Sequence, residues 1–427
     1  MSPPLRVLVF PCGTEIGLEI HRSLAYSRHF SVWGASSADD HGRMVYRNYV
    51  GGLPYVDAPD FLEALERCIQ QYRIDFVYPA HDAVVLKLAT HVSELSATVV
   101  ASDAVTCRIC RNKRDTYNFF RNVVAVPNIF DTPDQATYPV FLKPAVGQGS
   151  RGALRADSLL QAAAALERDP SLLLLEYLPG EEYTVDCFTD RHGQLRFAGV
   201  RIRQRISSGI SVRSKVVADA QLQQMARQIN EKLHLRGAWF FQVRRRADGE
   251  PVLMEIAPRI AGTMGLYRAL GVNFVLLTLF DRLDLEVQIT ALPVEGLVER
   301  ALIARYDLPV TYSVVYVDFD DCLMLGNGVN TELIRFLYQA RNNGKRLVLL
   351  TRHRQDIRQA LKTVAISEDL FDQIVVVAEQ QHKSDYIKER DAIFIDDSFA
   401  ERQRVQEVCG IATFAPDAVE ALIDWRR

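Results

Sequence analysis

The 427-residue chain has few of the features that mark secreted, membrane or nucleic-acid-binding proteins. Its seven cysteines are too few and too scattered for a disulfide framework, which favours a reducing compartment. No stretch reaches the roughly 18 apolar residues of a membrane span, and no basic start followed by an apolar run suggests a secretory signal. A formal net charge of −3 gives no basic footprint for nucleic acid. We therefore expect a cytoplasmic protein with neither a membrane nor a nucleic-acid partner.

A zinc or redox site is also poorly supported. Cys107 and Cys110 form a single Cys-x-x-Cys with no second pair nearby, so helical packing of two small side chains is the better interpretation. The length of the chain predicts two or three domains, because domains usually hold roughly 100–200 residues.

The first hundred residues alternate between strand and helix patterns. Residues 5–10 predict a buried strand, and the turn at residues 11–17 lacks the complete three-glycine fingerprint of a dinucleotide site. A later strand, residues 74–79, is followed by His81 and Asp82, at the strand end where α/β folds place ligands. These two residues either line a substrate cleft or form a loop and a helix cap.

A glycine-rich loop follows an apolar strand that ends in Lys143. Its residues are Gly147, Gly149, Ser150 and Gly152. Glycines let backbone N–H groups close around phosphate oxygens, and a lysine adds a point charge. The spacing is not that of a P-loop, so the loop alone is compatible with either a phosphate site or a plain turn.

Further motifs follow the glycine-rich loop at set distances, and Lys113 precedes it. They are Glu176-Tyr177-Leu178, Glu182, Gln242 and the run Glu255-Ile-Ala-Pro-Arg259. This ordered set resembles the ATP-grasp ligases, such as carbamoyl-phosphate synthase, biotin carboxylase and D-alanine–D-alanine ligase. The resemblance covers about residues 1–305 and implies ATP with Mg²⁺ or Mn²⁺ as cofactors. It also implies that a carboxylate attacks the γ-phosphate, and that an amine then displaces phosphate from the acyl phosphate.

The resemblance carries roles onto individual residues. The predicted cofactor-binding residues are Lys113, Lys143, Gly147, Gly149, Ser150, Gly152, Glu176, Tyr177, Leu178 and Glu182. In this group the lysines touch the phosphates, the glycine loop is the lid, residues 176–178 meet adenine, and Glu182 meets the ribose. Gln242 and Glu255 fall on metal-ligand positions, and Arg259 falls on the catalytic arginine beside the transferring phosphate.

Glu255 is informative without the resemblance, because a carboxylate in an apolar strand is costly to bury without a cation. A metal ion is the favoured partner, and an ion pair with Arg259 is the alternative. One departure concerns Ala257, where many relatives have an asparagine that binds a second Mg²⁺. That place is left to water or another carboxylate.

Three arginines, Arg201, Arg203 and Arg205, alternate along a predicted strand. Because every second residue of a strand points the same way, they are predicted to share one face. Such a face suits phosphates or a carboxylate substrate, and a solvated sheet edge is the alternative.

A different pattern begins near residue 306. A strand ends in Asp318-Phe-Asp320, and the following motifs supply Thr351, Lys383 and the acidic pair Asp396-Asp397. These four motifs resemble the haloacid dehalogenase (HAD) superfamily. The resemblance implies that Asp318 is the nucleophile, Asp320 the general acid/base, and Thr351 and Lys383 the phosphoryl ligands. Mg²⁺ would be held by Asp318, Asp320 and one of the two later aspartates, Asp396 or Asp397.

The predicted architecture is α/β in three parts. These are a Rossmann-like preATP-grasp domain (residues 1–111), an ATP-grasp domain (112–305) and a capless HAD-like domain (306–427). We expect an ADP-forming ligase for carboxylate and amine substrates, phosphorylated compounds among them, fused to a phosphatase. The alternatives are activation of bicarbonate or a small acid, as in carbamoyl-phosphate synthase, and a non-catalytic ATP sensor. Relatives are often dimers, so a homodimer is also an expectation.

Overall fold

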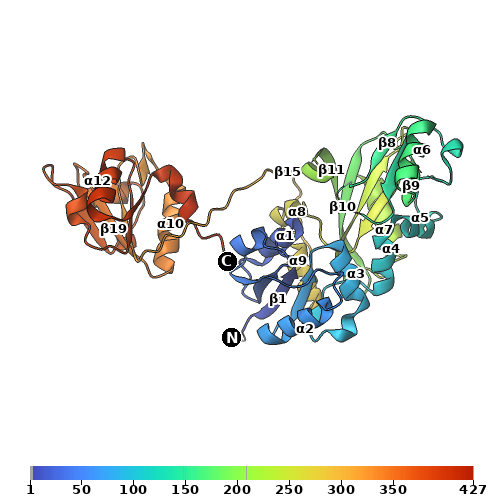
Figure 1. The fold of residues 1–427 in the computed structure, drawn as a ribbon, viewed down its shortest axis with the longest axis horizontal. Coiled ribbons are helices and arrows are strands. Elements are labelled where there is room, and N and C mark those ends of the chain that lie inside the picture. Colours follow the sequence, from blue (N-terminus) through green and yellow to red (C-terminus); the bar gives the residue numbers. More distant parts are fainter. Residues whose placement is uncertain (1–2, 148, 150, 208, 427) are drawn as a thin grey trace. The chain divides into compact units, whose positions relative to one another are not determined.

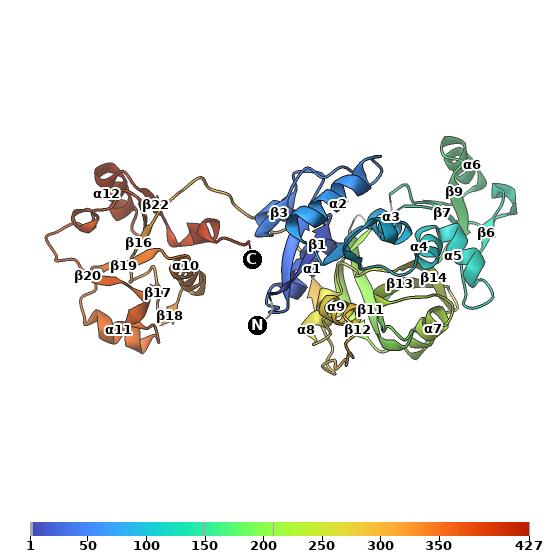
Figure 2. The ribbon, with the colours of Figure 1, turned by 90° about the horizontal axis from the view of Figure 1, so that it is seen from below.

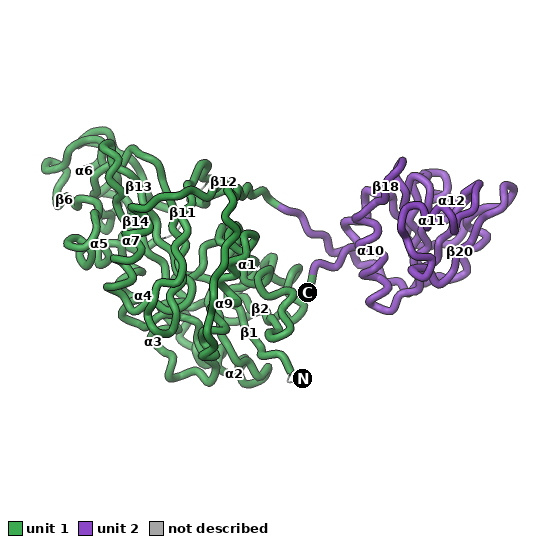
Figure 3. The backbone as a smooth tube through the Cα atoms, turned by 180° about the vertical axis from the view of Figure 1, so that it is seen from behind, with its two compact units in different colours: residues 1–302, 426–427 green, residues 303–425 purple. Residues whose placement is uncertain are grey.

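The computed structural model describes residues 3–147, 149, 151–207 and 209–426. The chain divides into two compact units, a larger one that ends at Leu302 and a smaller one, Ile303–Trp425 (Figure 3). Each unit has its own hydrophobic clusters.

The larger unit begins with a five-stranded parallel sheet of order β3-β2-β1-β4-β5. Its strands are β1 (Leu5–Phe10), β2 (Phe30–Ala35), β3 (Asn48–Val50), β4 (Phe76–Pro79) and β5 (Thr98–Val99). Its helices are α1 (Glu15–Leu24), α2 (Phe61–Tyr72), α3 (Asp82–Thr90) and α4 (Ala104–Arg111). Along β1, Val7 and Val9 pack towards α1, and Leu8 and Phe10 pack towards α2 (Figure 2). The strand order reverses between β1 and β4, and α/β sheets bind ligands beyond the carboxyl ends of strands at such a point.

Two antiparallel sheets complete the larger unit. The first, of order β6-β9-β7-β8, contains β6 (Ile129–Phe130), β7 (Val140–Pro144), β8 (Leu154–Ala156) and β9 (Leu172–Glu176). Its apolar face packs against Ala162 and Ala165 of α6 (Leu159–Arg168; Figure 1).

The second antiparallel sheet has the order β14-β13-β10-β11-β12-β15. Its strands are β10 (Glu182–Thr189), β11 (Leu195–Ser207), β12 (Ile210–Val217), β13 (Gly237–Arg245), β14 (Pro251–Ala257) and β15 (Leu297–Glu299). The remaining helices of the unit are α5 (Lys113–Phe120), α7 (Ala220–Asn230), α8 (Gly265–Ala269) and α9 (Phe274–Arg282). Trp239 and Phe241 of β13 pack with Leu222, Met225 and Ile229 of α7 in one cluster, which fixes the outer face of this sheet.

The smaller unit contains a five-stranded parallel sheet of order β20-β19-β16-β21-β22. Its strands are β16 (Val314–Val317), β19 (Arg346–Thr351), β20 (Gln373–Val376), β21 (Ala392–Ile395) and β22 (Ala412–Phe414). Its helices are α10 (Thr331–Asn342), α11 (Ile357–Thr363) and α12 (Phe399–Cys409). Between β16 and α10 the chain forms only a short hairpin, β17 (Met324–Leu325) with β18 (Gly328–Val329). Ligands are therefore expected at the carboxyl ends of β16, β19 and β21.

No helix within the described residues combines the length and the apolar character needed to cross a bilayer. All seven cysteines are free and buried. Cys107 and Cys110 lie one turn apart on α4, and burial raises the pKa of both thiols. Packing therefore accounts for this pair.

Candidate active sites

The larger unit contains a cavity of about 430 Å³ beyond the carboxyl ends of β1 and β4. Its wall includes six of the predicted site residues: Lys113, Gly147, Gly149, Gln242, Glu255 and Arg259. His81 and Asp82, at the start of α3, line it as well. The cavity thus joins the switch point of the parallel sheet to β13 and β14 of the six-stranded sheet.

Two lysines are buried beside this cavity. Lys113 begins α5 and is 9% exposed, and Lys143 lies near the end of β7 and is 7% exposed. The Lys143 ammonium lies 5.5 Å from the centre of the Tyr117 ring. Burial, together with the charge of Lys113, lowers the pKa of Lys143 to about 7. Neither ammonium group has a hydrogen bond or ion pair with a described residue. Two buried cations without counter-ions fit the phosphates of a nucleotide.

Glu255 and Gln242 lie directly opposite each other on β14 and β13. The Gln242 amide oxygen accepts a hydrogen bond of 3.0 Å from Arg203. The Glu255 carboxylate has no hydrogen bond or ion pair with a described residue, although its charge acts on Lys143 and Tyr117. A carboxylate and an amide oxygen side by side at a cavity wall fit a hard divalent cation.

Arg259 does not pair with Glu255, the alternative that the sequence left open. Its Nε and Nη2 atoms donate to the two carboxylate oxygens of Asp82, at 2.6 and 2.7 Å. Its Nη1 atom donates to the carbonyl of Ile260 at 2.9 Å, and its guanidinium lies 5.2 Å from the centre of the Phe240 ring. Burial would raise the pKa of Asp82, but the charge of Arg259 and its hydrogen bonds to the carboxylate hold this pKa below its usual value. The predicted catalytic arginine is therefore fixed in orientation by the parallel sheet.

His81 is a helix cap that also lines the cavity. Its Nδ1 atom accepts a hydrogen bond of 3.2 Å from the backbone N–H of Ala83 and so caps α3. The same side chain lines the cavity, where burial lowers its pKa. His81 is therefore a neutral group at the cavity wall near neutral pH.

The three arginines of β11 do not share one environment. Arg201 is fully buried and pairs with Asp186 at 2.8 Å, and Arg203 pairs with Glu182 at the cavity wall. The strand register shifts between Arg203 and Arg205, so Arg205 pairs with Glu299 of β15 at 2.7 Å and is 58% exposed. The predicted common face therefore ends at Arg203, because a bulge redirects the third side chain.

A smaller pocket is lined by Glu176, Tyr177 and Leu178, where the chain passes from β9 to β10. The Glu176 carboxylate pairs with Arg246 at 2.6 Å and accepts the backbone N–H of Asn128 at 3.1 Å. Its side chain therefore braces this connection, and the backbone N–H of Glu176 also donates to the carbonyl of Asn128 at 3.0 Å.

The predicted glycine-rich lid is only partly described by the structure. Gly152 has a φ of 71°, a conformation that favours glycine. Ser150 lies outside the described residues.

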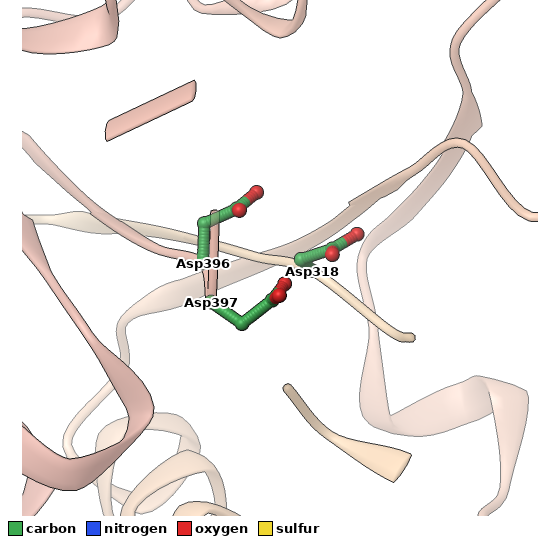
Figure 4. Close-up of side chains that lie close together, drawn as sticks. All are labelled: Asp318, Asp396 and Asp397. Atoms are coloured by element: carbon green, nitrogen blue, oxygen red, sulfur yellow. The ribbon is translucent and has the colours of Figure 1, made fainter. Parts of the chain in front are cut away.

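The smaller unit brings together side chains from its four motifs, but Asp320, a predicted metal ligand, is not among the clustered carboxylates. Asp318, Asp396 and Asp397 each place a carboxylate oxygen within 4.8 Å of the others (Figure 4). Lys383 lies 2.7 Å from Asp318 and 2.6 Å from Asp396. Burial raises the pKa of Asp318, and it raises that of Asp396 to about 6, although Lys383 opposes both shifts. One lysine for three carboxylates leaves excess negative charge, which fits a divalent cation.

Asp320 has a partner that the sequence reasoning missed. The Nδ1 atom of His353 lies 3.0 Å from both carboxylate oxygens of Asp320. The backbone N–H of the same histidine donates to the Thr351 hydroxyl at 3.2 Å. A polar residue two positions after the strand-ending Thr351 was a signal that could have identified it. Nearby, Arg352 pairs with Glu401 at 2.9 Å.

Comparison with known proteins bears on the larger unit. Residues 168–301 match a sequence family described as "ATP-grasp in the biosynthetic pathway with Ter operon". ATP-grasp enzymes use ATP with Mg²⁺ or Mn²⁺, which agrees with the cofactors predicted from the sequence. None of the curated proteins matches the chain in sequence.

Several solved structures share the fold. Pyruvate carboxylase from Rhizobium etli is 17% identical with a TM-score of 0.54. The match covers 67% of this chain but only 29% of the pyruvate carboxylase chain. The biotin carboxylase domain of 2-oxoglutarate carboxylase from Hydrogenobacter thermophilus, solved with MgADP, ADP and bicarbonate, is 14% identical with a TM-score of 0.57 (68% and 72% covered). L-amino acid ligase from Bacillus licheniformis is 17% identical with a TM-score of 0.54 (65% and 74% covered). The larger unit thus has the fold of these carboxylases and ligases, and its residues 168–301 are similar in sequence to an ATP-grasp family.

Proposed function

We propose that the larger unit is an ADP-forming ligase that joins a carboxylate to an amine through an acyl phosphate. One observation carries the proposal: Lys113, Gln242 and Glu255 line one cavity, and the buried Lys143 lies close enough to Glu255 for their charges to interact, although neither lysine has a hydrogen bond or ion pair with a described residue. Phosphoryl transfer needs cations on the phosphates and oxygen ligands for a metal ion, and this cavity supplies both.

Each residue then has a definite task. Lys113 and Lys143 bind the phosphates, and Gln242 and Glu255 offer oxygen ligands to Mg²⁺ or Mn²⁺. The metal, when bound, neutralises charge on the phosphates. Arg259 presents its remaining N–H groups to the transferring phosphoryl group, because Asp82 fixes the guanidinium. Ala257 offers no ligand atom, so a second ion would depend on water or another carboxylate.

The nucleotide base would bind beside residues 176–178. Glu176, Tyr177 and Leu178 line a pocket where the chain passes from β9 to β10, which supports the adenine assignment. Glu182 already pairs with Arg203, so its assignment to the ribose hydroxyls requires that this pair open or share its oxygens.

For the smaller unit we propose a metal-dependent phosphatase of the HAD type. Asp318 would attack phosphorus, and Asp320, held by His353, would donate a proton to the departing oxygen. Water would then release phosphate and regenerate the Asp318 carboxylate. Lys383 and Thr351 would hold the phosphoryl oxygens, with Asp318, Asp320 and Asp396 or Asp397 as metal ligands. The cluster of three aspartates around Lys383 supports this proposal.

The arrangement of the chain is part of the proposal. We retain the division into residues 1–111, 112–305 and 306–427, with the phosphatase acting on the ligation product or on a substrate before ligation. Partners would be small carboxylates and amines, phosphorylated ones among them, and a homodimer is the expected assembly.

The proposal is tested by nucleotide turnover with Mg²⁺ and pooled amino acids and small carboxylates, read as ADP against AMP. ADP that requires a pool and vanishes in Glu255→Gln supports the ligase. AMP instead of ADP, or no nucleotide turnover with any pool, overturns it.

One alternative activity has a specific observation in its favour. The H. thermophilus structure of the same fold holds bicarbonate, so activation of bicarbonate or a small acid is the second candidate. ADP formation that depends on bicarbonate and needs no amine would establish it. Tight ATP binding without turnover would instead favour a sensor.

A further inference from the structure

Helix α1 carries two glutamates one turn apart, and each pairs with an arginine from a distant part of the chain. Glu19 pairs with Arg268 at 2.7 Å, and its side chain is only 5% exposed. Glu15, the first residue of the helix, pairs with Arg300, and their side chains are 34% and 27% exposed. Glu15 and Arg300 line the cavity, whereas Glu19 and Arg268 do not. The two pairs have the same chemistry, and Arg268 is 31% exposed, but only the Glu15–Arg300 pair lies in the cavity wall, where a ligand could reach both partners.

The backbone around the Glu15–Arg300 pair approaches it closely. A side chain at Gly262 would place its Cβ atom 2.7 Å from the Glu15 carboxylate carbon, so the Glu15 carboxylate would have to move to accommodate it. The backbone N–H of Arg300 donates to the carbonyl of Val212 at 2.7 Å. The charge of Glu15 also acts on Arg259, so the pair lies close to the predicted phosphoryl-transfer centre.

Each partner retains unused hydrogen-bonding capacity. Glu15 binds Arg300 through Oε2, and its Oε1 atom has no hydrogen bond with a described residue. The Nη1 atom of Arg300 has only a long contact of 3.4 Å with the carbonyl of Ser211. A carboxylate acceptor and guanidinium donors therefore stand side by side in the cavity wall.

Such a pair distinguishes ligands by their charge pattern. A simple anion would meet repulsion from Glu15, and a simple cation would meet repulsion from Arg300. A zwitterion with adjacent ammonium and carboxylate groups complements both charges. We propose that Glu15 and Arg300 form the subsite for the amine substrate, and that this substrate is a free α-amino acid. The ammonium binds to Glu15, whose carboxylate can accept the proton that the nitrogen must lose before it attacks the acyl phosphate, and the carboxylate binds to Arg300. This inference rests on the proposed ligase function, which it extends.

The test compares three substrate pools in ADP formation with a fixed pool of small carboxylates: free amino acids, amino acid amides and N-acetylated amino acids. We expect turnover with the free amino acids alone. Glu15→Gln and Arg300→Gln should each raise KM for the amino acid about 10- to 100-fold, because each removes a charged hydrogen bond. Glu19→Gln, which alters the Glu19–Arg268 pair on the same helix, should leave this KM unchanged even if it lowers the melting temperature.

A second readout separates this inference from the ligase proposal. Calorimetric titration of the amino acid pool into the full-length protein with ADP and Mg²⁺ measures binding without turnover. Binding that is lost in Glu15→Gln and kept in Glu19→Gln supports the subsite even if no ADP forms. ADP formation with a KM unaffected by Glu15→Gln and Arg300→Gln, or no binding of any amino acid, overturns the subsite.

Discussion

In the larger unit two buried lysines have no hydrogen bond or ion pair with a described residue, whereas in the smaller unit a single lysine contacts two of three clustered carboxylates. The first arrangement has a deficit of negative charge and the second has a deficit of positive charge. Both deficits are costly in a buried site, so each indicates the ligand that would offset it: phosphates in one unit and a divalent cation in the other.

The two sites also differ in how they are assembled. The aspartate cluster is built at the carboxyl ends of adjacent parallel strands, β16 and β21, with Thr351 at the end of β19 beside them. The cavity collects residues from the parallel sheet, from α5 and from the six-stranded sheet. Variants that should abolish the activity of one site and leave that of the other unchanged are therefore the sharpest test of this comparison.

The largest expected effect follows from removing the nucleophile of the smaller unit. Asp318→Asn should lower hydrolysis of p-nitrophenyl phosphate by about 10³-fold or more, because the amide cannot form the phosphoenzyme. Thermal stability should not fall, since burial already disfavours the Asp318 carboxylate and Asp396 still pairs with Lys383. Asp321→Asn is the matched control, because this exposed neighbour has a φ of 53°, which asparagine tolerates. Undiminished hydrolysis in Asp318→Asn would contradict the assignment, and ADP formation by the larger unit should be unchanged.

The reciprocal variant removes the metal ligand of the larger unit. Glu255→Gln should lower ADP formation by about 100-fold, because an amide is a weaker ligand for Mg²⁺ than a carboxylate. Phosphate-ester hydrolysis by the smaller unit should be unaffected. Glu250→Gln provides the control, since Glu250 immediately precedes the same strand and pairs with Arg246 at the surface. Equal loss of both activities would show that the units do not act as separate sites.

The difference in assembly also explains which contacts the sequence predicted. Asp318, Thr351 and Asp396 come at the ends of apolar runs that become neighbouring strands, and their grouping in one site was expected from the resemblance of these motifs to the HAD superfamily. Lys383 was predicted from its motif and contacts two of the aspartates. Their catalytic roles remain predictions.

The cavity contacts were less accessible to sequence reasoning. Asp82 and Arg259 are 177 residues apart, and Glu15 and Arg300 are 285 apart. Each pair joins the parallel sheet to the part of the chain that follows β14, and no local periodicity encodes how those layers dock. Arg205 shows a second limit, because a bulge in β11 redirects the side chain and the strand period alone does not reveal it.

The Asp82–Arg259 pair offers a test of how strongly the layers of the larger unit depend on each other. Asp82→Asn leaves Arg259 partly buried without its carboxylate, so the free energy of unfolding of the larger unit should fall by about 3 kcal/mol. Denaturant titration measures this loss, and kcat for ADP formation should fall more than nucleotide affinity because Arg259 loses its orientation. The control is Asp60→Asn, since Asp60 is exposed and its side chain makes no capping hydrogen bond to α2. A change in nucleotide affinity with an unaltered kcat would contradict the positioning role.

The most gradual expected effect concerns pH, because one group changes the stability by at most about 1.4 kcal/mol per pH unit, and it has opposite signs in the two units. Lys143 has a pKa of about 7 in the folded protein against 10.5 ordinarily, so between these values the unfolded state binds more protons. The stability of the larger unit should therefore rise as pH increases from 7 towards 10. Asp396 has a pKa of about 6 against 3.8, so the folded state binds more protons in that interval. The stability of the metal-free smaller unit should fall as pH increases from 4 to 6.

Calorimetric unfolding at several pH values measures how the stability of each unit changes with pH. Lys143→Met should remove the rise in stability of the larger unit between pH 7 and 10.

Nucleotide binding gives an independent measure, because phosphates beside Lys143 favour its charged form and raise its pKa. Binding of ADP at pH 8 should therefore take up protons, and calorimetry in buffers of different ionisation enthalpy counts them. No proton uptake in the wild type, or equal uptake in Lys143→Met, would show that the phosphates do not bind at Lys143. Lys143 is a buried amine, so we expect ligand-induced stabilisation of the larger unit to require the nucleotide. Asp396 is a buried carboxylate, so Mg²⁺ alone should stabilise the smaller unit.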